Sequence, residues 1–202
     1  MDEELLFRVL LVAIYGLFFV IRIRYRVASI TQEPEQRYPQ WSKAMIFLMA
    51  AILGDLISLV MWIVAWPWVL LFQVPFPSWI RWLGVIGGLC CLPMVFWIHR
   101  VLGRQYSAEL AIQQDHKIVT VGPYSRTRHP MYTTLNIFSV SVALMSSNSL
   151  ILLFALLVVV PFPWIARMEE QMLLDQFGDE YRDYMMRTGR FFPQLSKAKT
   201  QK

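Results

Sequence analysis

The chain has little charge and almost no cysteine. Only 16% of its 202 residues are charged, against 56% that are hydrophobic, and this balance excludes an ordinary soluble domain. The two cysteines, Cys90 and Cys91, are adjacent within an apolar run, so they lack metal-site spacing and cannot cross-link distant segments. The sequence also lacks a phosphate-binding glycine loop, a serine-histidine-acid order and paired metal-ligand spacings. We therefore expect no bound metal.

Long apolar runs dominate what remains. A helical crossing of a bilayer needs about 20 mostly apolar residues, and such windows occur at 5–21, 44–66, 79–98, 131–146 and 149–166. We predict an all-α integral membrane domain over 1–202 with about five transmembrane helices. Only Ser147 and Asn148 separate the last two windows, which indicates a tight helical hairpin. Arginines rather than a small-residue cleavage site follow the first window, so we expect a retained anchor.

The basic residues predict the orientation of the chain in the membrane. Of the 19 lysines and arginines, 17 fall in the first connection, the third connection or the C-terminal tail. Because positive charge is retained on the cytoplasmic side, we expect the N-terminus outside and the C-terminus in the cytosol. The position of these cations beside apolar runs favours anionic lipid headgroups, not nucleic acid, as partners. The compact build favours a prokaryotic plasma membrane over the endoplasmic reticulum.

The polar segment from His116 to Tyr132 is the most informative part of the chain. It ends in Arg128-His129-Pro130 at the start of the fourth apolar window, and proline is well tolerated in the first turn of a helix. Free backbone amides at such a start, with two cationic side chains beside them, favour a carboxylate or phosphate. The plainer alternative is a positively charged anchor at Arg128, a polar cap at His129 and an interfacial tyrosine at Tyr132.

Two carboxylates follow the last apolar window on the same side of the membrane. Glu169 and Glu170 would suit the ammonium of a zwitterionic ligand whose carboxylate meets the cations of the first motif. Alternatively, they favour the helix dipole alone. From 168 to 186 the spacing predicts an amphipathic helix, broken at Gly178, that covers the site. Asp55, inside the second apolar window, lines a cavity or forms an interhelical hydrogen bond.

These motifs resemble a known family. The order is His-x-Ile-Val, Gly-x-Tyr, Arg-His-Pro-x-Tyr, a hydrophobic hairpin, Glu-Glu-x-x-Leu, Phe-Gly-x-Glu-Tyr and Arg-Thr-Gly-Arg-x-x-Pro. It resembles the isoprenylcysteine carboxyl methyltransferase family, including its prokaryotic membrane members, and more distantly the phospholipid methyltransferases. The resemblance covers 99–193. It implies an S-adenosyl-L-methionine-dependent methyltransferase with N-terminal spans at 1–98, a cofactor-binding catalytic core at 99–193 and a basic tail at 194–202.

The resemblance also implies roles for individual residues. The third connection and the C-terminal helix would form a cytosolic cofactor pocket, lined by His116, Lys117, Ile118, Val119, Tyr124, His129, Pro130, Met131, Tyr132, Glu169 and Glu170. Four residues before the first glutamate, where the family places an arginine for the substrate carboxylate, this chain has Ile165. Arg128 or Arg167 would then hold an anionic substrate head as catalytic residues.

We expect methyl transfer to an amphiphilic substrate at the cytosolic membrane face, with the carboxylate of a prenylated cysteine as one such acceptor. Two alternatives come from other classes. A nicotinamide-dependent membrane reductase related to sterol reductases would carry a similar histidine-proline element followed by tyrosine. A non-enzymatic lipid-binding protein would bind neither cofactor.

Overall fold

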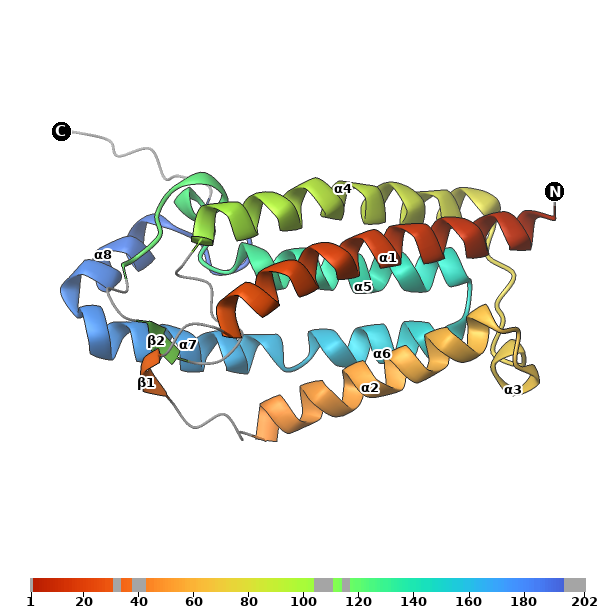
Figure 1. Cartoon of the computed structure of the whole chain (residues 1–202), viewed down its shortest axis with the longest axis horizontal. Helices are drawn as coiled ribbons and strands as arrows, with labels where there is room; N and C mark the ends of the chain where they lie inside the picture. Colours follow the sequence, from red (N-terminus) through yellow and green to blue (C-terminus); the bar gives the residue numbers. More distant parts are fainter. Residues whose placement is uncertain (1, 31–33, 38–42, 104–110, 114–116, 195–202) are drawn as a thin grey trace.

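The structure is a computed structural model that describes residues 2–30, 34–37, 43–103, 111–113 and 117–194. Within these residues the chain is mainly helical (Figure 1). The longer helices are α1 (Glu3–Ile30), α2 (Lys43–Ile63), α4 (Ser78–Leu102), α5 (Pro130–Ser146), α6 (Ser149–Val159) and α7 (Phe162–Phe177). The shorter elements are α3 (Pro67–Leu70), the 3-10 helix η2 (Gly122–Ser125), α8 (Asp179–Arg187) and the strands β1 (Pro34–Arg37) and β2 (Ala111–Gln113).

The helices pack in two groups joined by a hairpin. In Figure 1, α1, α4 and α5 run side by side, and α2 lies against α6. Glycines let α4 approach α5 closely, because a Cβ at Gly84 would lie 2.7 Å from the carbonyl oxygen of Ser141. The ring of Phe18 in α1 stacks on Phe138 in α5 with centroids 3.7 Å apart. A continuous apolar core therefore links the first half of the chain to the second.

The predicted hairpin is confirmed. Ser147 adopts a left-handed conformation with φ of 53° and ends α5. The side chain of Asn148 caps α6 by accepting hydrogen bonds from the backbone N–H groups of Leu150 and Ile151. Its amide also donates to the carbonyl of Val69, 2.8 Å away, so the turn is fixed to α3.

The integral membrane architecture is confirmed as well. Four segments of the described chain are long and apolar enough to cross a membrane: Glu3–Val27, Lys43–Ile63, Ser78–Leu102 and Ser149–Phe177. α6 and α7 form the last one together, separated only by a turn at Val160 and Pro161. The remaining expected crossing is α5, whose 17 residues rise about 26 Å. It is the shortest of the expected crossings and packs against α1, α4 and α6 inside the bundle.

Among the described residues, a small two-stranded sheet departs from the predicted all-helical fold. β1 in the first connection pairs with β2 in the third connection in antiparallel register. The two connections leave the membrane at the same end of the bundle, and extended backbone there satisfies its hydrogen-bonding groups by pairing. This end also holds α7, α8 and the start of α5, opposite the N-terminus (Figure 1).

The chain reverses direction at Gly178. This residue lies between α7 and α8 and has a positive φ of 53°, which glycine adopts without steric cost. The break predicted in the amphipathic segment is thus confirmed. The reversal brings α8 and the residues after it back to the start of α5.

Candidate functional site

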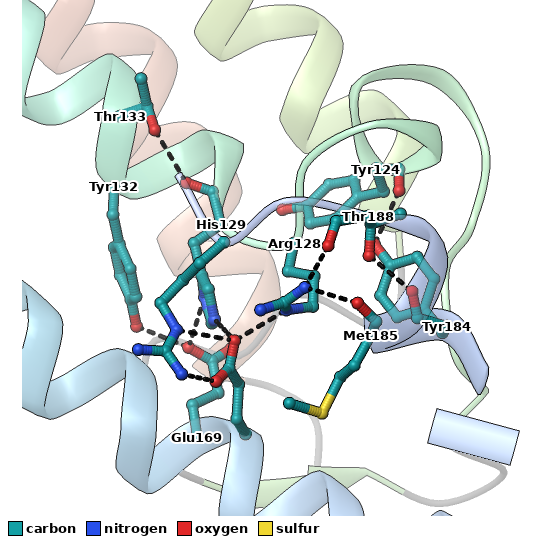
Figure 2. A network of polar contacts seen from close by, with 11 residues as sticks. Tyr124, Arg128, His129, Tyr132, Thr133, Glu169, Tyr184, Met185 and Thr188 are labelled. Atoms are coloured by element: carbon teal, nitrogen blue, oxygen red, sulfur yellow. Dashed lines mark hydrogen bonds and ion pairs between the residues drawn. The ribbon is translucent and has the colours of Figure 1, made fainter. Parts of the chain in front are cut away.

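The candidate site lies where the start of α5, the middle of α7 and the chain after α8 meet. Figure 2 shows Arg128, His129 and Tyr132 from the first of these segments beside Glu169 from the second. Thr188 and its neighbours enter from the third. The sequence separates these groups by up to 60 residues, as in the contact of Arg128 with Thr188. The two patches predicted to form one receptacle therefore lie together.

Backbone pairing fixes the closing segment to the Arg-His-Pro motif. The N–H of Arg128 donates to the carbonyl of Gly189 at 2.8 Å, and the N–H of His129 donates to the carbonyl of Arg190 at 2.9 Å. In return the N–H of Gly189 donates to the carbonyl of Arg126 at 3.1 Å. A Cβ at Gly189 would lie 1.8 Å from the carbonyl oxygen of Phe192, so this tight turn requires glycine. The Arg-Thr-Gly-Arg motif is thus part of the site.

Glu170 is the buried centre of an ion-pair cluster. Only 3% of the residue is exposed. One of its oxygens accepts from Nε of Arg128 at 2.8 Å and from Nε of Arg190 at 3.1 Å, and the other accepts from Nη2 of Arg190 at 2.5 Å. Nε2 of His129 lies 3.3 Å from the first oxygen. The partners of Glu170 are therefore residues of the protein itself, and their charges and hydrogen bonds compensate the cost of burying its carboxylate.

The guanidinium of Arg128 also bonds only to described residues of the protein. Besides Glu170, its guanidinium donates to the carbonyl of Met185 at 3.1 Å and to the carbonyl of Thr188. Its side chain is 9% exposed. The hydroxyl of Thr188 donates to the carbonyl of Tyr184, whose own hydroxyl donates to the carbonyl of Tyr124 at 2.6 Å (Figure 2). This chain of hydrogen bonds connects η2, α8 and the start of α5.

Glu169 differs from its neighbour in exposure. Its side chain is 31% exposed. One oxygen accepts a hydrogen bond from the hydroxyl of Tyr132 at 2.8 Å and lies 3.4 Å from Nδ1 of His129. Neither arginine of the cluster contacts it, so Glu169 has fewer partners among the described residues than Glu170 and a more exposed side chain.

His129 lies between the two carboxylates. Its Nδ1 faces Glu169 and its Nε2 faces Glu170, so both ring nitrogens meet acceptors. Burial disfavours the charged ring, but the hydrogen bonds and charges of Glu169 and Glu170 outweigh it and raise the pKa of His129 above its ordinary value. The ring stacks against Tyr132 with centroids 5.3 Å apart, and Tyr132 contacts Phe162 of α7 in turn.

The remaining residues predicted to bind the cofactor differ in burial and surroundings. Tyr124 and Pro130 are buried, whereas Met131 turns toward α1, where Nη1 of Arg22 lies 3.3 Å from its sulfur. Ile118 and Val119 are partly buried and Lys117 is exposed on the segment leading to η2. His116 lies outside the described residues.

The structure places Arg167 and Arg190 in different surroundings. Arg167 is exposed on α7 and forms no hydrogen bond or ion pair with any residue that the structure describes. Arg190, for which we predicted no role, holds Glu170. Arg190 belongs to the closing Arg-Thr-Gly-Arg motif that carries part of the family resemblance, although its distance along the chain does not indicate the contact with Glu170.

The bundle and this buried cluster define an integral membrane protein with a polar site at one end of its helices. A family profile described as phospholipid methyltransferase matches residues 79–180, half of the chain. The chain belongs to this family of membrane methyltransferases, and the matched range contains Arg128, His129, Tyr132 and both glutamates.

The fold is similar to that of a solved membrane protein. The structure of the eukaryotic intramembrane Ras methyltransferase ICMT (isoprenylcysteine carboxyl methyltransferase) superposes with a TM-score of 0.52 at 17% identity, over 92% of this chain and 68% of that one. This likeness shows the fold.

Two curated bacterial proteins are similar in sequence. The nickel-cobalt-cadmium resistance protein NccN of Alcaligenes xylosoxydans xylosoxydans is 35% identical over 85 residues, and the cobalt-zinc-cadmium resistance protein CzcN of Cupriavidus metallidurans is 35% identical over 89. Each match covers 42% of this chain and 39% of the relative.

Proposed function

We propose that the protein transfers the methyl group of S-adenosyl-L-methionine to an amphiphilic substrate at the membrane face where α5 begins. The observation that carries this proposal is the unequal pair of carboxylates. Arg128, Arg190 and His129 all contact Glu170, while the adjacent Glu169 keeps a partly exposed side chain that accepts a hydrogen bond from the hydroxyl of Tyr132.

The donor set of the site fits the amino-acid end of this cofactor. That end carries an ammonium and a carboxylate, so it needs partners of both signs. Glu169 offers the negative partner. The positive end of the dipole of α5 and the ring of His129, whose pKa the two glutamates raise, offer the positive side. When bound, the cofactor supplies an electrophilic methyl group on a sulfonium, which leaves as a neutral thioether.

In this proposal the protein's residues position the methyl donor and the acceptor, and they transfer no proton. A carboxylate acceptor needs no general base, so catalysis comes from alignment of donor and acceptor and from exclusion of water. Glu169 and Tyr132 contact the cofactor in this proposal, and the neighbouring His116, Lys117, Ile118, Val119, Tyr124, His129, Pro130 and Met131 contribute as the family resemblance implies. Arg128 and Arg190 act through Glu170 as positioning residues, because both guanidiniums are already engaged.

The cofactor assignment is tested by calorimetry with S-adenosylhomocysteine on purified protein. We expect Glu169→Gln to weaken binding by about 10- to 100-fold, the equivalent of the roughly 1.5–3 kcal/mol of a charged hydrogen bond. The matched control is Glu180→Gln, which removes an exposed carboxylate from the nearby α8. Equal affinity of wild type and the Glu169 variant would remove Glu169 from the site.

A second titration with reduced nicotinamide adenine dinucleotide phosphate separates the enzyme classes. Binding of that cofactor instead of S-adenosylhomocysteine would indicate a reductase, and binding of neither would indicate a lipid-binding protein without catalysis. A methyltransferase binds only the first.

The acceptor is identified by incubation with labelled methyl donor, a membrane lipid extract and a farnesylated cysteine analogue. Label in the cysteine analogue as a base-labile ester would place the carboxylate of a prenylated cysteine among its substrates. Label in the lipid fraction would assign phospholipid methylation. We expect the reaction on the cytosolic face, which an inside-out vesicle preparation would test through access of the donor.

A further inference from the structure

We propose that a groove beside the site, between the start of α2 and the α6–α7 turn, binds an acidic phospholipid of the surrounding leaflet as a ligand that is not methylated. The groove has a volume of about 300 Å³ and is lined by Lys43, Ala44, Phe47, Val160, Pro161 and Trp164. We call it the α2–α7 groove. This assignment does not depend on the identity of the reaction.

The walls of the groove suit an acyl chain. Phe47 is 42% exposed and Trp164 is 54% exposed, and Val160 and Pro161 lie between them on the turn that separates α6 from α7. A bilayer-crossing helix exposes such side chains to lipid without cost. A tryptophan at the end of an apolar run is typical of the membrane–water boundary, where a headgroup lies. The groove therefore runs from the hydrocarbon region to the headgroup level.

Two cations stand at the headgroup end. Lys43 is the first residue of α2 and lines the groove, and no acidic residue lies in the first turn of that helix. Arg167 follows Trp164 by three residues, so it lies on the same face of α7 about one turn further from the hydrocarbon. Both side chains are exposed, and neither pairs with an acid among the described residues.

The register of α7 separates Arg167 from Glu169, the carboxylate proposed to contact the cofactor. Glu169 lies two residues further along, about 200° around the helix. Glu170, the acid closest to Arg167 along the helix face, is saturated by Arg128 and Arg190. Arg167 is thus exposed without a paired acid among the described residues, and a phosphate-bearing headgroup supplies the matching anion.

Native mass spectrometry of the purified protein tests the proposal with dioleoylphosphatidylglycerol and dioleoylphosphatidylcholine at equal concentration, without methyl donor. We expect one retained phosphatidylglycerol adduct in preference to phosphatidylcholine. The double variant Lys43→Gln/Arg167→Gln should lose that preference by at least about fivefold, the effect of one cation near a headgroup. The control Arg24→Gln/Arg100→Gln removes two other exposed cations and should keep it.

A second variant tests the groove itself. Ala44→Phe keeps both cations but fills the groove, so it should lower phosphatidylglycerol retention as far as the double variant does. Circular dichroism of each variant in micelles verifies that it is folded.

Three results would overturn the proposal: equal retention of both lipids by wild type, an equal loss in the control variant, or displacement of the bound lipid by the methyl acceptor in a one-to-one exchange. The last would assign the groove to the substrate. Because no methyl donor is present, failure here leaves the proposed methyl transfer intact, and failure of S-adenosylhomocysteine binding leaves this site intact.

Discussion

Replacement of Glu170 by Gln should destabilise the protein more than any other single charge removal in the site. The side chain of Glu170 is 4% exposed and that of Arg128 is 9% exposed. The change would leave the guanidinium of Arg128 buried without its carboxylate, and removal of one partner of a buried pair costs about 3–5 kcal/mol. Arg190→Gln should cost less, about 1–2 kcal/mol, because its side chain is 32% exposed and Glu170 keeps Arg128 and His129.

The free energy of unfolding can be followed by far-UV circular dichroism during titration of dodecylsulfate into mixed micelles. Glu180→Gln, an exposed acid on α8, is the control and should stay within about 0.5 kcal/mol of wild type. Adding Arg128→Met to Glu170→Gln should recover part of the loss, since the orphaned cation is then gone. The reasoning fails if Glu170→Gln matches the control, or if Arg190→Gln is the more damaging change.

Two further changes probe other parts of the structure. The raised pKa of His129 predicts a pH-dependent stabilisation. A histidine whose pKa is raised on folding stabilises the folded state fully at pH values below its unfolded-state pKa of about 6.5. This contribution to the free energy of unfolding is lost as the pH rises through the folded-state pKa. The stability difference between wild type and His129→Gln should therefore shrink at alkaline pH, and a difference that grows would contradict the charged ring. At the opposite end, buried Arg81 donates to the carbonyl of Met145 at 3.0 Å and pairs with Glu4 at 2.8 Å. Arg81→Met should lower the free energy of unfolding by about 1–3 kcal/mol, whereas an unchanged midpoint would show that this pair is replaceable by packing.

The sequence predicts much of the helical framework because few backbone conformations can cross a membrane. Apolar runs must be helical to satisfy their backbone, so the windows were recognisable from length alone. Asn148 and Gly178 were recognisable as helix boundaries from their residue types. Asparagine readily caps a helix, and glycine readily adopts the positive φ found at Gly178. The β1–β2 pairing was not predictable, since it joins two polar connections without an apolar pattern.

The composition of the site was predictable, but the division of roles within it was not. Neighbouring residues on a helix differ by about 100° in direction, and only the packing of α7 decides which of two adjacent glutamates turns toward the arginines. Arg167, on the same helix, is exposed. Arg190 reaches Glu170 across 20 residues and a chain reversal, a contact for which local spacing gives no signal.

The reversal at Gly178 and the register of α7 are both needed to build the site. α7 carries Glu169 and Glu170 toward α5, and the turn returns the chain so that Gly189 and Arg190 pair with the backbone of Arg128 and His129. Arg190 then neutralises Glu170 from one side while Arg128 does so from the other. With this acid satisfied, His129 is held in place between the two carboxylates, and Glu169 is left partly exposed beside Tyr132. Docking of the C-terminal segment and assembly of the candidate cofactor surface are therefore one structural event, because the same hydrogen bonds accomplish both.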